Sequence, residues 1–160
     1  MNIGSSLERA INEQISEEIA SSQMYRQAYG WLKYHGYEGF AKLYEKYYKE
    51  ELKHADMFTN HLLDRNGVLM CEAIKQHTED FDSIQEIVDA TLEHEIYITS
   101  KITELYELCI GRGLISQKFM LDMLNEQIEE EDKAQTLVDR VSIAGKDDCG
   151  LLILDTQLGD

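Results

Sequence analysis

The sequence predicts an all-α protein. Proline is absent from the 160 residues, and most of the ten glycines fall between long segments rather than within them. Inside those segments the apolar residues recur at steps of three and four, which is the spacing of one helical face. These observations predict four long helices and a short fifth one. The length suits one core, so we expect residues 1–160 to form a single domain.

The first two helices are predicted over residues 7–34 and 38–65. The tripeptide HGY at 35–37 is too short for anything but a tight turn, so these helices should form an antiparallel hairpin. Asn66 and Gly67 follow the second helix. Both residue types tolerate the left-handed conformation that closes a helix, and they therefore mark its end.

The third and fourth helices are predicted over residues 83–110 and 114–144, joined by the tight turn GRG at 111–113. They should form a second hairpin. The tail at 146–160 carries a short apolar run, LLIL, which by pattern alone could be a strand. A lone strand would have no partner, so we expect a docked helical turn.

The link at residues 66–82 is long for a compact domain. Its roughly 17 residues can span ~55 Å, whereas a helix of about 28 residues is only ~42 Å long. The link can therefore cross the whole length of the helices and connect opposite ends of the two hairpins.

Charge and composition limit the classes of partner. The formal charge is -16, from 31 acidic and 15 basic residues, which disfavours nucleic acid and anionic membranes and favours cations. No segment approaches the ~20 apolar residues of a membrane span, and no signal peptide is recognisable, so we expect a cytoplasmic protein. The three cysteines are expected to be free thiols.

Polar residues interrupt the apolar stripe of every long helix near its middle. In chain order the interruptions are Glu18 in the first helix, Glu51 and His54 in the second, Glu95 in the third, and Gln127 and Glu130 in the fourth.

These interruptions lie at matching levels. Counted from Gly36 in the first turn, Glu18 lies 18 residues before it and His54 lies 18 residues after it. Around Arg112 in the second turn, the acid of the third helix lies 17 residues before and that of the fourth 18 after. Within each hairpin, the polar residues of the two helices therefore lie at the same height. Packing the hairpins side by side should bring all of these acids close together.

Buried carboxylates need positive charge or protons nearby, because an ionised carboxylate in a dry core costs several kcal/mol. Lys46, Lys53 and Arg26 lie off the stripes. Metal ions and shared protons remain as the two explanations. Oxygen ligands with a single imidazole suit iron better than zinc. Glu51 and His54, three residues apart, stand on one helix face and can hold the same ion.

The chain resembles the non-haem bacterial ferritins along nearly its whole length. The matching segments are INEQISEEIASSQMY, YEGFAKLYEKYYKEELKHA, LEHEIYITSKITEL, NEQIEEEDKAQ and LLILDTQLG, in that order. The resemblance implies a ferritin-like four-helix bundle with a long crossover between helices two and three and a short C-terminal fifth helix. It also implies a homo-oligomeric cage of 24 subunits that oxidises Fe(II) with dioxygen or hydrogen peroxide and stores ferric mineral.

The resemblance also implies roles for individual residues. A first iron would bind Glu18, Glu51 and His54, with Glu51 bridging to a second iron. The other residues implied are Glu95 and Gln127 at the second iron, Glu130, Glu50, Glu126 and Glu129 at a third, and Tyr25 as an electron donor. Without the resemblance, Tyr25 reads equally well as core packing, and the acidic run from Glu126 reads as a solvated helix face.

Two departures separate the chain from other diiron families. The fourth helix has no second Glu-x-x-His, and Leu52 stands where bacterioferritins carry a haem-binding methionine, so haem is not expected. A rubrerythrin-like diiron peroxidase and a non-catalytic metal-binding helical shell are the alternative functions. The remaining histidines are interpreted as surface or structural residues: His35, His61, His77 and His94.

Overall fold

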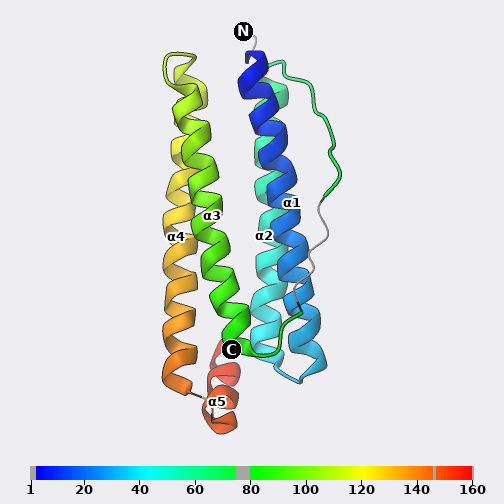
Figure 1. Cartoon of the computed structure of the whole chain (residues 1–160), viewed down its shortest axis with the longest axis vertical. Coiled ribbons are helices and arrows are strands. Elements are labelled where there is room, and N and C mark those ends of the chain that lie inside the picture. Colours follow the sequence, from blue (N-terminus) through cyan, green and yellow to red (C-terminus); the bar gives the residue numbers. More distant parts are fainter. Residues whose placement is uncertain (1–2, 75–79, 146, 160) are drawn as a thin grey trace.

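The structure, a computed structural model, describes residues 3–74, 80–145 and 147–159 and contains five helices in these ranges (Figure 1). Their bounds are α1 Ser5–Tyr34, α2 Glu38–Asp64, α3 Ile84–Cys109, α4 Leu114–Ala144 and α5 Asp148–Gly159. The predicted bounds of the four long helices differ from these by no more than two residues. None of the described helices combines the length and the apolar composition that crossing a bilayer requires.

The long helices form two antiparallel hairpins that pack side by side (Figure 1). One hairpin is α1 with α2 and the other is α3 with α4, as the short turns predict. Gly36 and Gly111 adopt φ values of 83° and 76°, in the left-handed region where glycine is favoured. The start of α2 and the start of α3 lie at the same end of the bundle (Figure 1), so the end of α2 and the start of α3 lie at opposite ends.

The end of α2 has the geometry that its sequence predicts. Asn66 has φ 57°, and the Gly67 amide donates to the Leu62 carbonyl at 2.9 Å, which is the long bond of a Schellman cap. The link then runs beside α1, where the Asn12 side chain donates to the Val68 carbonyl at 2.9 Å. This part of the link is therefore tied to the bundle.

The short helix α5 closes the end of the bundle where α1 meets α2. Its Asp155 carboxylate accepts a hydrogen bond from the Phe40 amide at 2.8 Å, in the first turn of α2. A side chain at Gly39 would overlap the backbone, because a Cβ there would lie 1.7 Å from the Asp155 carbonyl oxygen. The expected docked turn is thus a full helix. Its Asp155 side chain caps the N-terminus of α2, where the N-cap residue Tyr37 makes no side-chain cap hydrogen bond.

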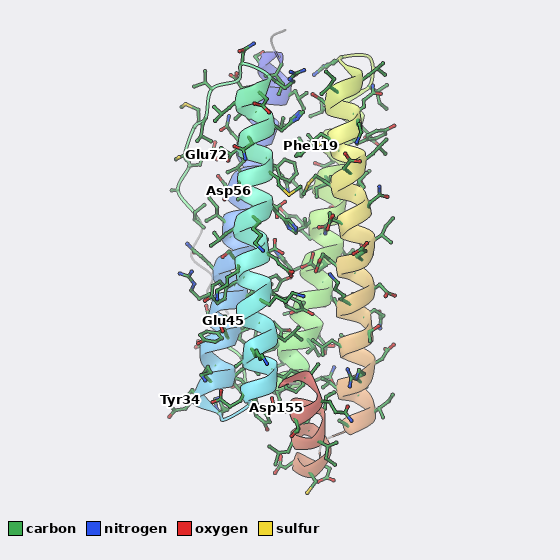
Figure 2. The ribbon with its side chains drawn as sticks, turned by 180° about the vertical axis from the view of Figure 1, so that it is seen from behind. Tyr34, Glu45, Asp56, Glu72, Phe119 and Asp155 are labelled. Carbon is green, nitrogen blue, oxygen red and sulfur yellow. The ribbon has the colours of Figure 1, made fainter. Side chains whose placement is uncertain are left out.

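The core has two apolar clusters separated by a polar layer. The lower cluster, at the α5 end, contains Tyr25, Phe40 and Tyr44, and the upper cluster, at the other end, contains Phe58 and Met120. Figure 2 shows side chains filling the space between the hairpins, with Phe119 pointing from α4 toward α2. The polar layer lies at mid-helix, at the level where each predicted stripe is interrupted.

Candidate metal centre

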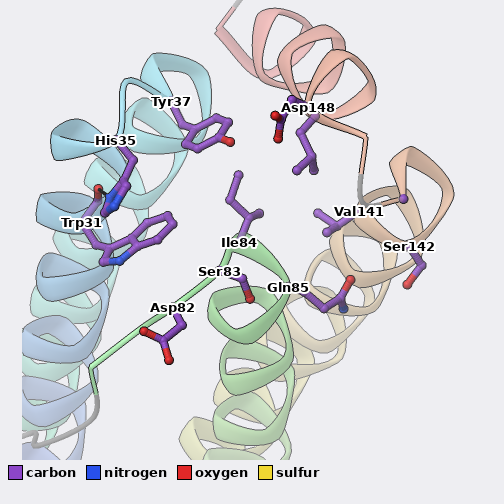
Figure 3. A pocket seen from close by; sticks show the side chains of 12 residues that line it. Trp31, His35, Tyr37, Asp82, Ser83, Ile84, Gln85, Val141, Ser142 and Asp148 are labelled. Carbon is purple, nitrogen blue, oxygen red and sulfur yellow. Dashed lines mark hydrogen bonds between the residues drawn. The ribbon is translucent and has the colours of Figure 1, made fainter.

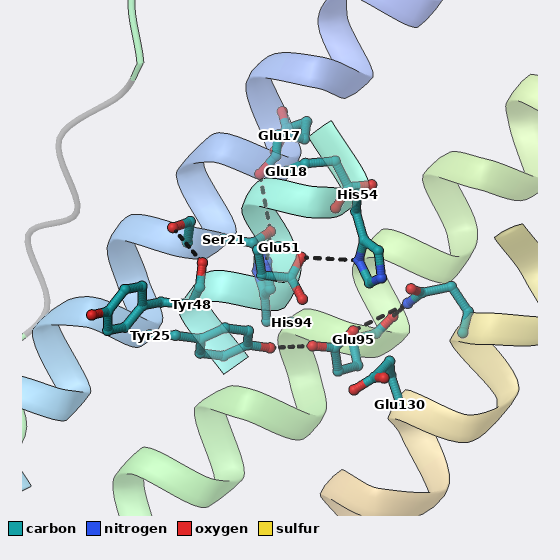
Figure 4. A network of polar contacts seen from close by, with 12 residues as sticks. Glu17, Glu18, Ser21, Tyr25, Tyr48, Glu51, His54, His94, Glu95 and Glu130 are labelled. Atoms are coloured by element: carbon teal, nitrogen blue, oxygen red, sulfur yellow. Dashed lines mark hydrogen bonds and ion pairs between the residues drawn. The ribbon is translucent and has the colours of Figure 1, made fainter. Parts of the chain in front are cut away.

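The polar layer contains six side chains from the four long helices (Figure 4). All of them are buried, with only 1% of Glu18 and 4% each of Glu51 and Glu95 exposed. The members are Glu18 from α1, Glu51 and His54 from α2, Glu95 from α3, and Gln127 and Glu130 from α4. The predicted interruptions therefore meet at one level of the bundle.

The half of this layer formed by α1 and α2 brings three donors together. Ligand atoms of Glu18, Glu51 and His54 all lie within 4.8 Å of one another. The His54 Nδ1 atom lies 3.7 Å from the nearer Glu51 oxygen. Across the described ranges, no other group of three acids, histidines or cysteines meets this criterion.

The two carboxyls of this half lie close together, with a ligand oxygen of Glu18 within 4.8 Å of one of Glu51. Gln14 donates to Glu18 Oε1 at 2.8 Å, while the second Glu18 oxygen is buried and has no hydrogen-bond partner among the described residues. An unsatisfied buried carboxylate oxygen is uncommon in native proteins and needs an explanation. A cation bound between these side chains would supply one.

Burial controls the protonation of these acids. Loss of water raises the pKa of Glu18 well above its usual value, and the neighbouring Glu51 charge raises it further. Burial and the charge of Glu95 likewise raise the pKa of Glu51. Both groups therefore favour protonation in the absence of a cation, which is the shared-proton alternative that the sequence left open.

The half formed by α3 and α4 is arranged differently, because its donors already have protein partners. The Tyr25 hydroxyl donates to one Glu95 oxygen, and the Gln127 amide donates to the other at 3.1 Å. Burial raises the pKa of Glu95, and these two hydrogen bonds act in the opposite direction. Glu130 accepts a hydrogen bond from Lys133 at 2.9 Å. The carboxylates of this half therefore already accept hydrogen bonds from protein groups, unlike the second oxygen of Glu18.

Tyr25 belongs to a group of three packed tyrosines below the acids. Its ring centroid lies 6.0 Å from that of Tyr44 and 5.8 Å from that of Tyr47. Burial raises the pKa of the Tyr25 hydroxyl, and the Glu95 charge adds to this effect, so the phenol stays protonated. Tyr25 therefore packs in the core and also donates a hydrogen bond to the candidate ligand Glu95. Core packing and a position beside the candidate metal centre, the two interpretations of the sequence, are thus compatible.

The acids predicted to form a third site lie on α2 and α4. Glu126 and Glu129 are exposed on α4, whereas Glu50 is partly buried on α2. Glu50 lies 3.7 Å from Lys46 through one oxygen, and its other oxygen is buried with no partner in the described part of the chain. The third site stays a prediction.

Sequence reasoning missed two residues that contact the acids. We expected no protein cation beside the acids, which is wrong for Lys133: it lies three residues after Glu130 and reaches its carboxylate. That spacing was visible in the sequence. Gln14 lies on the buried stripe of α1, four residues before Glu18. The sequence does not indicate which group its side-chain amide bonds, and in the structure it donates to Glu18.

The other described histidines and the cysteines lie outside the candidate metal centre. His61 is buried, stacks on Phe119 at 4.2 Å and contacts the Ser116 hydroxyl at 3.1 Å. His94 contacts the Ser21 hydroxyl at 2.6 Å, and His35 is exposed. His77 lies outside the described residues. Free thiols are found at all three cysteine positions, Cys71, Cys109 and Cys149.

A separate hollow of about 720 Å³ lies at the α5 end of the bundle (Figure 3). Trp31, Tyr37, Ile84 and Val141 line it together with several polar side chains. None of the six side chains of the polar layer lines it, so this hollow is distinct from the candidate metal centre.

Comparison with known proteins identifies relatives over almost the whole chain. A family profile described as a ferritin-like domain matches residues 8–144. A bacterial non-heme ferritin of Bacteroides fragilis is 31% identical over 98% of both chains, and one of Escherichia coli is 30% identical over 92% of this chain and 90% of its own. Among solved structures, an open pore ferritin of Archaeoglobus fulgidus superposes with a TM-score of 0.95 at 28% identity, covering 98% of this chain and 96% of its own.

Proposed function

The chain belongs to the ferritin family, and on that premise we propose that it is an iron-storage ferroxidase. It oxidises Fe(II) to Fe(III) at a diiron centre in the polar layer and deposits ferric mineral inside a multi-subunit shell. One observation carries the proposal. Glu18, Glu51 and His54 converge in a buried layer where one carboxylate oxygen has no partner among the described residues.

The donor set fits Fe(II) as the substrate. Two carboxylates and one imidazole form the first iron position, and Glu51 bridges to a second position completed by Glu95 and Gln127. Carboxylate oxygens suit hard divalent ions, and the imidazole shifts the preference toward iron. Burial raises the pKa of both Glu18 and Glu51, so protons held by these carboxyls leave as iron enters, because a ligand carboxylate must be deprotonated.

The oxidation step requires two electrons from two Fe(II) ions. Dioxygen takes both electrons with two protons and becomes hydrogen peroxide, and peroxide itself can accept two more. Tyr25, hydrogen-bonded to Glu95 beside the second position, is placed to supply a further electron. Its burial among other tyrosines keeps water away from the phenol.

The storage part of the proposal requires a shell, and we propose 24 copies in a cytoplasmic cage without haem. Several large apolar side chains are highly exposed on this chain, including Tyr34 at 87%, Ile143 at 85% and Leu114 at 82%. Exposed apolar side chains of this size are expected to be covered by neighbouring subunits. The charge of -16 per chain would attract Fe(II) to the assembly.

Stopped-flow absorbance after Fe(II) is added in air tests this function. We expect rapid oxidation by the wild type and its loss in Glu51→Ala and His54→Ala, with the assembly intact by light scattering. Glu45→Ala is the matched control, since Glu45 lies on the same helix but pairs with Lys49 away from the layer. Wild-type rates in Glu51→Ala and His54→Ala would refute the assignment.

A further inference from the structure

Lys133 makes an ion pair that differs from the others of the described residues. Its ammonium lies 2.9 Å from Glu130, whose carboxylate is only 10% exposed, while the lysine side chain is 43% exposed. The pair of Lys118 and Asp122 on the same helix joins side chains that are 75% and 56% exposed. Lys133 thus reaches from the surface of α4 to the edge of the buried polar layer.

More than one acid acts on this ammonium. Partial burial disfavours its charge, but Glu130, Glu50 and Glu129 together outweigh burial and raise the pKa of Lys133. Glu50 comes from α2, a different helix from that of Lys133, and has a buried oxygen with no partner in the described ranges. A lysine ammonium has three donors, so it suits a position between several carboxylates.

We propose that Lys133 is a cation that reaches in from the surface of α4, neutralises the Glu130 flank in the iron-free protein and competes with a divalent ion for the Glu130 carboxylate. This inference rests on the proposed function and adds a control of metal loading to it. Lys133 acts through Glu130 and is a positioning residue.

Two physical effects make this competition unfavourable for the ion. An ion that takes Glu130 as a ligand must compete with a charge-assisted hydrogen bond. It must also approach a fixed positive charge, and repulsion between charges a few ångströms apart stays appreciable near a protein surface. The ions bound by the α3 and α4 half should therefore bind more weakly than the ion held by Glu18, Glu51 and His54.

Titration calorimetry of the iron-free assembly with Zn²⁺, which undergoes no redox change, tests the proposal. Lys133→Met removes the charge but keeps an unbranched side chain that suits a helix. We expect the weaker class of Zn²⁺ ions to bind about ten-fold more tightly in this variant, with the tightest ion unchanged. Lys133→Arg keeps the charge and should behave as the wild type.

Lys118→Met provides the matched control, because it removes one lysine from an exposed pair on the same helix. Equal tightening in Lys118→Met and Lys133→Met would show a general charge effect and overturn the proposal. Unchanged or weaker binding of the weaker class in Lys133→Met would also overturn it. Glu51→Ala tests the proposed function separately: if it leaves the tightest Zn²⁺ ion in place, the metal centre itself is wrongly assigned.

Discussion

The polar layer and the apolar clusters above and below it are built on the same four helices, yet they have opposite effects on the fold. Phe58 in the upper cluster is fully buried and packs edge-on against Phe119 at 5.2 Å. About two turns away on the same helix, Glu51 is also buried, at 4% exposed, but among carboxylates. The clusters therefore stabilise the bundle, while the layer between them lowers its stability unless protons or cations neutralise it.

The largest effect is expected in the upper cluster. Phe58→Ala removes a buried ring and leaves a cavity, which should lower the free energy of unfolding by about 3 to 5 kcal/mol. Urea denaturation of the iron-free protein measures this. The binding of Zn²⁺ to folded protein should hardly change, because Phe58 touches no candidate ligand. If Phe58→Ala lowered the free energy of unfolding by less than about 1 kcal/mol, the upper cluster would not be a main source of stability.

A change of opposite sign is expected in the polar layer. Glu51→Met replaces a buried acid by an apolar side chain of similar length and removes its repulsion with Glu95. The iron-free protein should gain about 1 to 3 kcal/mol of stability near pH 8, and it should lose its stabilisation by divalent ions. Denaturation with and without Zn²⁺ checks both. A destabilised variant would contradict the comparison.

The contribution of the polar layer to stability should depend on pH, whereas the contribution of the apolar clusters should not. Glu18, Glu51 and Glu95 have raised pKa values in the folded chain, so folding favours their protonated forms. Their contribution to stability is present below the unfolded pKa of about 4.3 and is lost as the pH rises through the folded values.

The melting temperature of the iron-free protein should therefore fall as the pH rises above the usual glutamate range. Each group that releases its proton would remove at most about 1.4 kcal/mol per pH unit. Glu51→Met should show a shallower fall, and an identical slope in the two proteins would place the titrating groups elsewhere.

The smallest effect is expected for a buried acid outside the layer. Asp155 accepts a hydrogen bond from the Phe40 amide, so its carboxylate is satisfied without a cation. Asp155→Ala should destabilise the protein by about 1 kcal/mol, the usual loss for a helix cap and opposite in sign to Glu51→Met. Thermal unfolding measures it, and a stabilising Asp155→Ala would remove the distinction between the two kinds of buried acid.

Most of the fold was predictable because its signals are periodic. The interruption of each stripe by polar residues also located the layer, since helices of similar length joined by tight turns must align their midpoints. The docking of α5 was less accessible. Asp155 looks like a break in an apolar run, and its role depends on the contact with α2, which no local pattern encodes.

The side chains that meet in the polar layer were predictable, whereas their hydrogen bonds were not. The spacing identified Glu18, Glu51, His54 and Glu95 as neighbours, and the structure brings them together. Which carboxylate oxygens are already bonded depends on side-chain directions. The partner of Gln14 and the difference between the two halves of the layer were therefore found only in the structure, whereas the spacing of Lys133 and Glu130 was visible in the sequence.

Anomalous diffraction from crystals of the iron-free protein soaked with Fe(II) under anaerobic conditions would locate the bound iron. We expect an iron peak between Glu18, Glu51 and His54, with weaker peaks beside Glu95 and Glu130. Iron bound elsewhere in such crystals, with no peak in the polar layer, would contradict it.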